Sequence, residues 1–422
     1  MKKILYSLAI MMMGMTVVAC SNDDDSNKPG ETTDEQYKDK TYGYKAIDAC
    51  AEVVNQLEAA NQQIGSANLS TEQETFLRNV LSNLVDNVIV PTYTDLANDV
   101  ENLENTLHGL TTSSITQAQI DQACTDFKKA RQHWERSEAF LMGAASEFDV
   151  DPTIDSWPLN RSLLLNYFNG GMSDEMLEDA TILGFHALEF ILFRNGQNRK
   201  VAELQGNDTY TKFEKISGAQ ELSYAQTICT LLKQRCFQLQ VAWEGKTTAN
   251  SNRANIVEAA GLDITNSKGL SFGNNLKQAG TTQSTFPTLK AAIAQVLSDD
   301  EGSCVGIANE VGTAKIANPF ANADIAYVES PYSYNSITDF QDNIRSIRNV
   351  WLGSTNGSTA SYSFSTFFSN VGKTTFDKEV VNVINAAIDD IAKMPAPFVK
   401  YCSIVWGKSF DNPENWDSIT EE

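Results

Sequence analysis

Histidine is scarce in this sequence: the 422 residues include three, His108, His133 and His186. The residues that follow them are Gly, Trp and Ala, so the zinc-peptidase motif HExxH is absent. The inverted motif HxxEH is also absent, because Phe190 stands where its second histidine would be. A site with two histidines and one glutamate would need His108 or His133, since no histidine follows His186. This scarcity counts against zinc-peptidase chemistry, although it does not exclude it.

Basic side chains are also few. The 32 Lys and Arg residues stand against 54 Asp and Glu, which gives a formal net charge of −22. A protein with this excess of negative charge repels nucleic acid and anionic membrane surfaces and attracts cations. Nucleic acid is therefore not an expected partner. Acidity also favours solubility, so the net charge alone does not predict a cation site.

The seven cysteines include no CxxC pair, which argues against a zinc knuckle or a thioredoxin-type redox site. Cys229 and Cys236 are seven residues apart on a predicted helix. That spacing separates them by roughly 10 Å along the helix axis, beyond the reach of a disulfide. We expect most of the six cysteines that follow Cys20 to be small buried hydrophobic residues.

The apolar run at the N-terminus, within MKKILYSLAIMMMGMTVVAC, is too short to span a bilayer. Two lysines precede it and small residues end it, which is typical of a secretory signal peptide, here residues 1–19. The segment VVAC resembles a bacterial lipobox, which implies cleavage before Cys20 and lipidation of that residue. The alternative is an ordinary secreted protein in which Cys20 is buried.

Residues 20–40 are polar and acidic without periodicity, and they predict a disordered tether that carries the lipid anchor. Several acyl chains together hold a protein stably on a membrane. The expected location is therefore the cell envelope, as an outer-membrane lipoprotein that faces the periplasm or the surface. An acidic run directly after the lipidated cysteine also resembles a surface-export signal of some Gram-negative lipoproteins.

Alternating strand patterns are sparse, and helical periodicity dominates. Helical patterns cover residues 44–64, 70–110, 115–147, 173–193, 222–244, 286–298, 336–352 and 374–392, with a shorter one within 397–406. Pro91 is expected to kink the second of these. The sequence predicts an all-α protein of two packed helical-bundle domains, residues 41–205 and 206–422, with a site in the cleft between them.

The stretch LGFHALEFILF, residues 183–193, is almost entirely apolar, yet it carries His186 and Glu189. Residues three apart share one face of a helix, so this pair can bind a divalent metal or act as an acid and a base. Alternatively, the two side chains hydrogen-bond each other or a buried arginine and merely join helices. Gly184 weakens the helix and is best tolerated where another backbone or a ligand comes close.

The segment GFHALE matches the GxHxxE signature of the imelysin family, also called iron-regulated protein A-like. Three other segments resemble the family in the same order: ARQHWERSEAFLMGAAS at 130–146, IDSWPLN at 154–160 and VESPYSYNSITDFQDNIRSIRNVWLG at 328–353. The resemblance covers most of the chain from about residue 40. It implies an all-helical protein with two bundle-like domains, a site in the cleft between them and a link to iron uptake. The family is also classed among metallopeptidases.

The resemblance extends to individual side chains. Glu138 falls in the match to the family's Glu-Ala-Phe helix, and we place it beside His186 and Glu189 as a third metal ligand; the alternative is a surface ion pair. Further residues that can bind a cofactor or a metal complex through oxygen or nitrogen atoms are Arg131, Trp134, Asp155, Glu329, Ser330, Ser333, Asp339 and Asn343.

These observations favour an extracytoplasmic lipoprotein that binds iron, another divalent metal or a metal complex, in iron uptake. An outer-membrane transport system is a candidate partner. The alternatives are a metal-dependent peptidase, and a surface adhesion or scaffolding module in which the HxxE motif is structural. We assign no catalytic residue.

Overall fold

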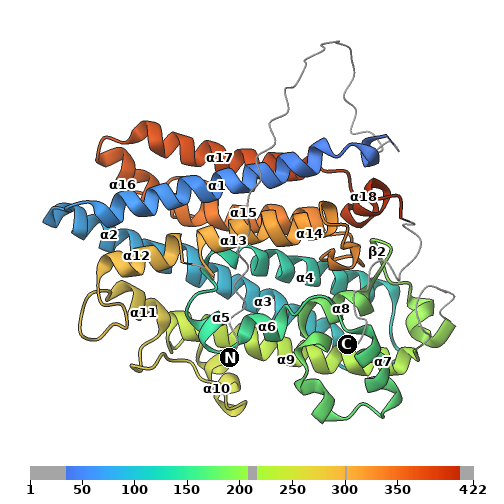
Figure 1. The fold of residues 1–422 in the computed structure, drawn as a ribbon. Coiled ribbons are helices and arrows are strands. Elements are labelled where there is room, and N and C mark those ends of the chain that lie inside the picture. Colours follow the sequence, from blue (N-terminus) through green and yellow to red (C-terminus); the bar gives the residue numbers. More distant parts are fainter. Residues whose placement is uncertain (1–34, 208–215, 300–301, 409–422) are drawn as a thin grey trace.

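The computed structural model describes residues 35–207, 216–299 and 302–408, and the regular structure of these ranges is almost entirely helical (Figure 1). The α-helices are α1 (Thr41–Ser66), α2 (Thr71–Leu84), α3 (Val90–Leu107), α4 (Gln117–Glu135), α5 (Ala144–Glu147), α6 (Val150–Ile154), α7 (Arg161–Asn169), α8 (Gly184–Leu192), α9 (Gly218–Glu244), α10 (Ser251–Ala259), α11 (Phe272–Lys277), α12 (Leu289–Leu297), α13 (Cys304–Glu310), α14 (Ala317–Phe320), α15 (Ser336–Leu352), α16 (Phe364–Asn370), α17 (Thr374–Ala392) and α18 (Phe398–Val405). The all-α prediction is confirmed.

Two short strands, β1 (Phe193–Arg194) and β2 (Gln197–Asn198), follow α8 directly and pair antiparallel. Asn195 and Gly196 form the turn between them, and both have positive φ, as a tight hairpin turn requires. The described ranges contain no helix that is both long enough and apolar enough to cross a membrane.

Sequence signals account for most helix starts. Ser70 caps α2 through a reciprocal capping box with Gln73, one residue before the Glu74 that the pattern suggested. Thr116 and Gln119 form the same arrangement at the start of α4. Along α1 the buried residues recur at three- and four-residue spacing, which turns one face of the helix toward the core.

Pro91 does not end the helical run that contains it. A π-helical turn, Val85–Ile89, precedes it, and Pro91 lies in the first turn of α3. A widened turn accommodates the missing N–H and the ring of a proline inside a helix. A π-helical turn therefore separates α2 from α3 at the place where the kink was expected.

Two predicted helices are shorter than their patterns. The run 115–147 is helical as α4 only to Glu135; after it come a 3-10 turn, Glu138–Phe140, and the short helix α5. The run 173–193 contains two 3-10 segments, and its α-helix begins only at Gly184. Apolar spacing predicts burial on a face, but it does not locate these interruptions.

The helices pack across the whole chain rather than in sequence order. The N-terminal helix α1 lies beside α17, with α15 and α13 next to them, whereas α3 packs against α4 and α9 (Figure 1). Contacts between α4 and α15 join these groups, and one continuous apolar core runs through them. The division into domains 41–205 and 206–422 stays a prediction, and α1 and α9 both pack across that division. All six described cysteines are buried, as expected for most of them, and all six are free.

Candidate functional site

The close contact between α6 and α8 sets the position of the HxxE motif. Gly184, the first residue of α8, has φ of +70°, and a Cβ on it would lie 2.0 Å from the carbonyl oxygen of Ile154. Only glycine permits this approach. The expectation that Gly184 marks a close backbone approach is confirmed. The contact places His186 next to Asp155, the residue that follows α6.

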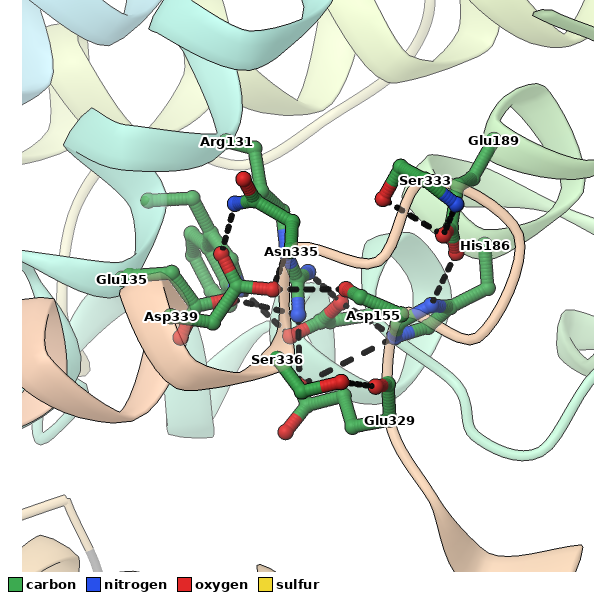
Figure 2. Close-up of polar contacts among 12 residues, drawn as sticks. Arg131, Glu135, Asp155, His186, Glu189, Glu329, Ser333, Asn335, Ser336 and Asp339 are labelled. Carbon is green, nitrogen blue, oxygen red and sulfur yellow. Dashed lines mark hydrogen bonds and ion pairs between the residues drawn. The ribbon is translucent and has the colours of Figure 1, made fainter. Parts of the chain in front are cut away.

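Arg131 on α4 is the hub of a buried polar centre (Figure 2). Its guanidinium lies 2.5 Å from a carboxylate oxygen of Glu135 and 2.5 Å from one of Glu329, and it is also paired with Asp155. A fourth carboxylate, that of Asp339, is 3.9 Å away. Arg131 is 1% exposed, so these charges compensate one another in the interior and not in solvent.

The His186–Glu189 pair lies beside this hub. The Nδ1 atom of His186 is 3.4 Å from Glu189 Oε2, and its Nε2 atom is 3.2 Å from Asp155 Oδ1. Each side chain of the pair is 1% exposed. The pair is therefore inside the protein and does not face an open cleft, contrary to the expectation from the sequence.

Glu189 can stay buried because a loop distant in the sequence donates hydrogen bonds to its carboxylate. Its Oε1 atom accepts bonds from the backbone N–H of Tyr332 at 3.0 Å, the N–H of Ser333 at 2.7 Å and the Ser333 hydroxyl at 2.7 Å. Ionised carboxylates with several such donors avoid most of the penalty of burial. Glu189 thus fastens α8 to the loop before α15.

That loop, residues 328–335, is strained and heavily bonded. Ser330 and Tyr334 both have positive φ, which is uncommon for residues other than glycine. The Ser330 hydroxyl donates to Asp339 at 2.6 Å, and the Asn335 side chain donates to the same carboxylate. Strained backbone that the surrounding structure holds in place is common at functional sites.

Burial and the neighbouring charges shift the pKa values of this centre in opposite directions. Burial and the Arg131 charge lower the pKa of His186, but its hydrogen bonds to Asp155 and Glu189 outweigh them and raise it to about 9. Burial would raise the pKa of Asp155, but Arg131 and His186 hold it below its usual range. Burial raises the pKa of Asp339 to about 7, against the opposing effect of Arg131.

The structure brings the eight predicted binding residues into this one centre. Arg131 contacts Asp155, Glu329 and Asp339, and Ser330 and Ser333 bond to Asp339 and Glu189. The Trp134 Nε1 atom donates to Asp155 Oδ2 at 2.6 Å, and the Asn343 side chain donates to Glu135. Glu135 was not among the predicted residues, although its position four residues after Arg131 on α4 was a usable signal.

Glu138 lies elsewhere than predicted. It is grouped with Asp151 and Asp155, and not with the His186–Glu189 pair. These three carboxylates line a cavity of about 170 Å³ whose wall also includes Trp157, Glu310, Lys315, Tyr327 and Glu329; we call it the Glu138 cavity. Asp151 was missed, although it precedes Asp155 by four residues and so lies on the same side of α6. No sequence signal pointed to Lys315.

Two groups of side chains have ligand atoms close enough to hold one metal ion. In each group, Asp155–His186–Glu329 and Glu138–Asp151–Asp155, these atoms lie within 4.8 Å of one another. Every member of the first group is engaged in protein contacts, because Arg131 binds both carboxylates and His186 faces Asp155. The second group shares only Asp155 with the first. The second group fits a metal ion better, since Glu138 has no hydrogen bond or ion pair to any other described residue.

The fold and this centre define an all-helical protein in which an HxxE helix is joined to a distant loop through buried charges. Residues 89–415, most of the chain, match imelysin, and the protein therefore belongs to the imelysin family. The resemblance found in the sequence is confirmed.

Two relatives accompany this match. Iron-regulated protein A of Synechococcus elongatus (strain ATCC 33912 / PCC 7942 / FACHB-805) is 25% identical over 281 residues, 67% of this chain and 66% of the relative. The matched region thus spans slightly less than two thirds of that relative's length. The crystal structure of a candidate iron-regulated protein A precursor from Parabacteroides distasonis ATCC 8503 has a TM-score of 0.60 at 22% identity, covering 80% of this chain and 96% of that one. This second likeness supports the fold.

Proposed function

We propose that this protein is a cell-envelope lipoprotein that binds iron, another metal ion or a metal complex through its buried carboxylate centre, and that it serves iron uptake. The name of the Synechococcus elongatus relative, iron-regulated protein A, supports the link to iron. An outer-membrane transport system would be its partner, and the lipid on Cys20 would hold it at the membrane.

One observation carries the proposal: carboxylates outnumber basic groups in the centre and the adjoining Glu138 cavity. The acids are Glu135, Glu138, Asp151, Asp155, Glu189, Glu310, Glu329 and Asp339, and the bases are Arg131, His186 and Lys315. Burying uncompensated negative charge is costly unless protons or cations neutralise it. Burial accordingly raises the pKa of Glu138 well above its usual range and that of Asp151 to about 7. A bound cation would remove the same cost.

Asp155 belongs to both candidate ligand groups, so Asp155→Asn tests metal binding wherever the ion lies. We expect the wild-type protein, purified without chelator, to contain close to one metal ion per chain by elemental analysis. We expect Asp155→Asn to weaken the affinity for added Fe²⁺ or Mn²⁺ about tenfold or more, because a charged ligand is lost. The matched control is Asp389→Asn, which changes an exposed aspartate and should bind as wild type does. A wild-type protein with no metal content and no affinity for either ion would contradict the proposed function.

The membrane anchor has its own test. Cys20 lies outside the described residues, so the lipobox is the basis of the prediction. Cys20→Ala is expected to move the protein from the membrane fraction to the soluble fraction, because the acyl chains that hold it are no longer attached. Immunoblots of the two fractions measure this, with Cys50→Ala as a control that leaves the lipobox intact. A Cys20→Ala protein that still partitions with membranes would refute the anchor.

A further inference from the structure

We infer that the metal ion is held in the Glu138 cavity by Glu138, Asp151 and Asp155, whereas the His186–Glu189 pair of the GxHxxE motif is a fastening between α8 and the 328–335 loop. The inference rests on the proposed function and assigns the site within it. It separates the motif that marks the family from the side chains that would contact the ion.

Glu138 is the first support. Its side chain is 4% exposed, yet it makes no hydrogen bond or ion pair with any other described residue, and it lines the cavity. Buried carboxylates normally have partners, because an unpaired one is costly. Asp151, which also lines the cavity, likewise makes no side-chain hydrogen bond or ion pair within the described ranges. Two neighbouring carboxylates are thus oriented toward one space without a protein partner.

Geometry is the second support. Oxygen atoms of Glu138, Asp151 and Asp155 lie within 4.8 Å of one another, a separation that one ion can bridge. Asp151 lies on α6, Asp155 directly follows that helix, and the 3-10 turn after α4 supplies Glu138. The cavity, about 170 Å³, has room for an ion and several waters, since one water occupies about 30 Å³.

The contacts of the HxxE pair are the third support, because they leave few donor atoms for a metal. Glu189 Oε1 already accepts three hydrogen bonds from Tyr332 and Ser333. Each ring nitrogen of His186 faces a carboxylate, one of Glu189 and one of Asp155. An ion bound to this pair would have to displace contacts that hold the loop in its strained conformation. The pair is therefore better suited to positioning than to ligation.

The donor set indicates the class of ion. Three carboxylates, completed by water, suit hard cations such as Mn²⁺, Fe²⁺, Fe³⁺, Mg²⁺ and Ca²⁺, and they do not suit ions that prefer thiolates. Lys315 also lines the cavity, where its Nζ atom lies 3.1 Å from Glu329 and 3.7 Å from Glu310. Its positive charge opposes a bound cation, so Lys315→Gln should tighten binding.

The experiment uses Mn²⁺ as the probe, because the EPR signal of the free aqueous ion reports the bound fraction directly. We expect Glu138→Gln and Asp151→Asn each to weaken Mn²⁺ binding at least tenfold. Thermal melts without metal should give melting temperatures equal to wild type or higher, because each variant replaces a carboxyl group that has no protein partner in the described ranges. Loss of binding without loss of stability distinguishes a ligand from a structural residue. Glu147→Gln, the same change at an exposed position, is the matched control and should bind as wild type does.

For Glu189→Gln we expect the opposite result, a loss of stability without a loss of Mn²⁺ binding. It should lower the melting temperature, because a neutral amide accepts the loop hydrogen bonds less strongly. The folded fraction should keep its Mn²⁺ affinity within about twofold, since the ligands of the cavity are unchanged. If Glu138→Gln and Asp151→Asn bind as wild type does while Glu189→Gln does not, this inference is overturned and the proposed function survives at the HxxE pair. If the wild-type protein binds neither Mn²⁺ nor Fe²⁺, both fail.

Discussion

Replacing Arg131 with methionine is expected to lower the free energy of unfolding by about 4 kcal/mol or more at pH 8. Its guanidinium, 1% exposed, pairs with Asp155, Glu135 and Glu329. Methionine fills similar space but leaves these buried carboxylates without their shared counter-charge. Breaking a buried ion pair by removing one partner is among the costliest single substitutions, because the remaining charges stay desolvated.

The loss should depend on pH in a defined direction. Burial raises the pKa of Glu135 and of Asp155 and the Arg131 charge lowers both, so removing Arg131 should shift both folded-state pKa values upward. Such groups destabilise the fold progressively as pH rises through the folded-state pKa, so the loss should be smaller at pH 5 than at pH 8. Urea denaturation of wild type and Arg131→Met at both pH values, in chelator, measures this. Lys246→Met is the control, because the Lys246–Glu258 pair is about half exposed and should contribute at most about 1 kcal/mol. An Arg131→Met protein within 1 kcal/mol of wild type at pH 8 would contradict the role of Arg131 as the hub.

The second large effect is expected from Gly184→Ala, which should destabilise the protein by about 3 kcal/mol. The residue has φ of +70°, and the new methyl group would lie 2.0 Å from the Ile154 carbonyl oxygen. The nearest atoms all belong to the Ile154 backbone, which cannot rotate away as a side chain could, so α6 and α8 must separate. Because that contact holds Asp155 against His186, metal binding should weaken in the same variant.

Gly109→Ala isolates the steric part of this effect. Gly109 has nearly the same φ, +71°, but nothing lies within 4 Å of the position its Cβ would take. The free energy of unfolding of Gly109→Ala should fall only by the cost of placing an alanine in the left-handed conformation, about 1 kcal/mol. Thermal or urea unfolding of the two variants gives the comparison. Equal losses would show that the α6–α8 contact adds nothing beyond backbone strain.

The sequence supported a correct account of which residues gather at the centre and an incomplete account of how they are used. The family resemblance placed Arg131, Asp155 and Glu329 at one site, and the structure joins them through ion pairs. The i, i+3 spacing correctly put His186 and Glu189 on one face of a helix. The helical spacing did not predict that backbone N–H groups of the loop donate hydrogen bonds to Glu189, because these bonds join residues more than a hundred positions apart in the chain.

The misplacement of Glu138 has a similar cause. Its position in the predicted run 115–147 assumed a continuous helix, which would have kept it in register with Arg131 and Glu135. The helix ends at Glu135, and the 3-10 turn that follows redirects Glu138 toward Asp151. An interruption of this kind depends on contacts with other elements, such as the hydrogen bond that the Ala139 N–H donates to the Ser346 hydroxyl. Such contacts leave no periodic signal in the sequence.

The pairing of α1 with α17 constrains the order in which the protein can fold. The apolar face of α1 is completed by α17, which begins at Thr374, so part of this face stays exposed until residues 374–392 have been synthesised. Contacts between such distant segments slow folding, because the entropy of closing a long loop is lost before the contacts form. A chain truncated before α17 would present a long amphipathic helix without its partner, which makes an unfinished protein vulnerable to proteases and delays compaction until its C-terminal helices are available.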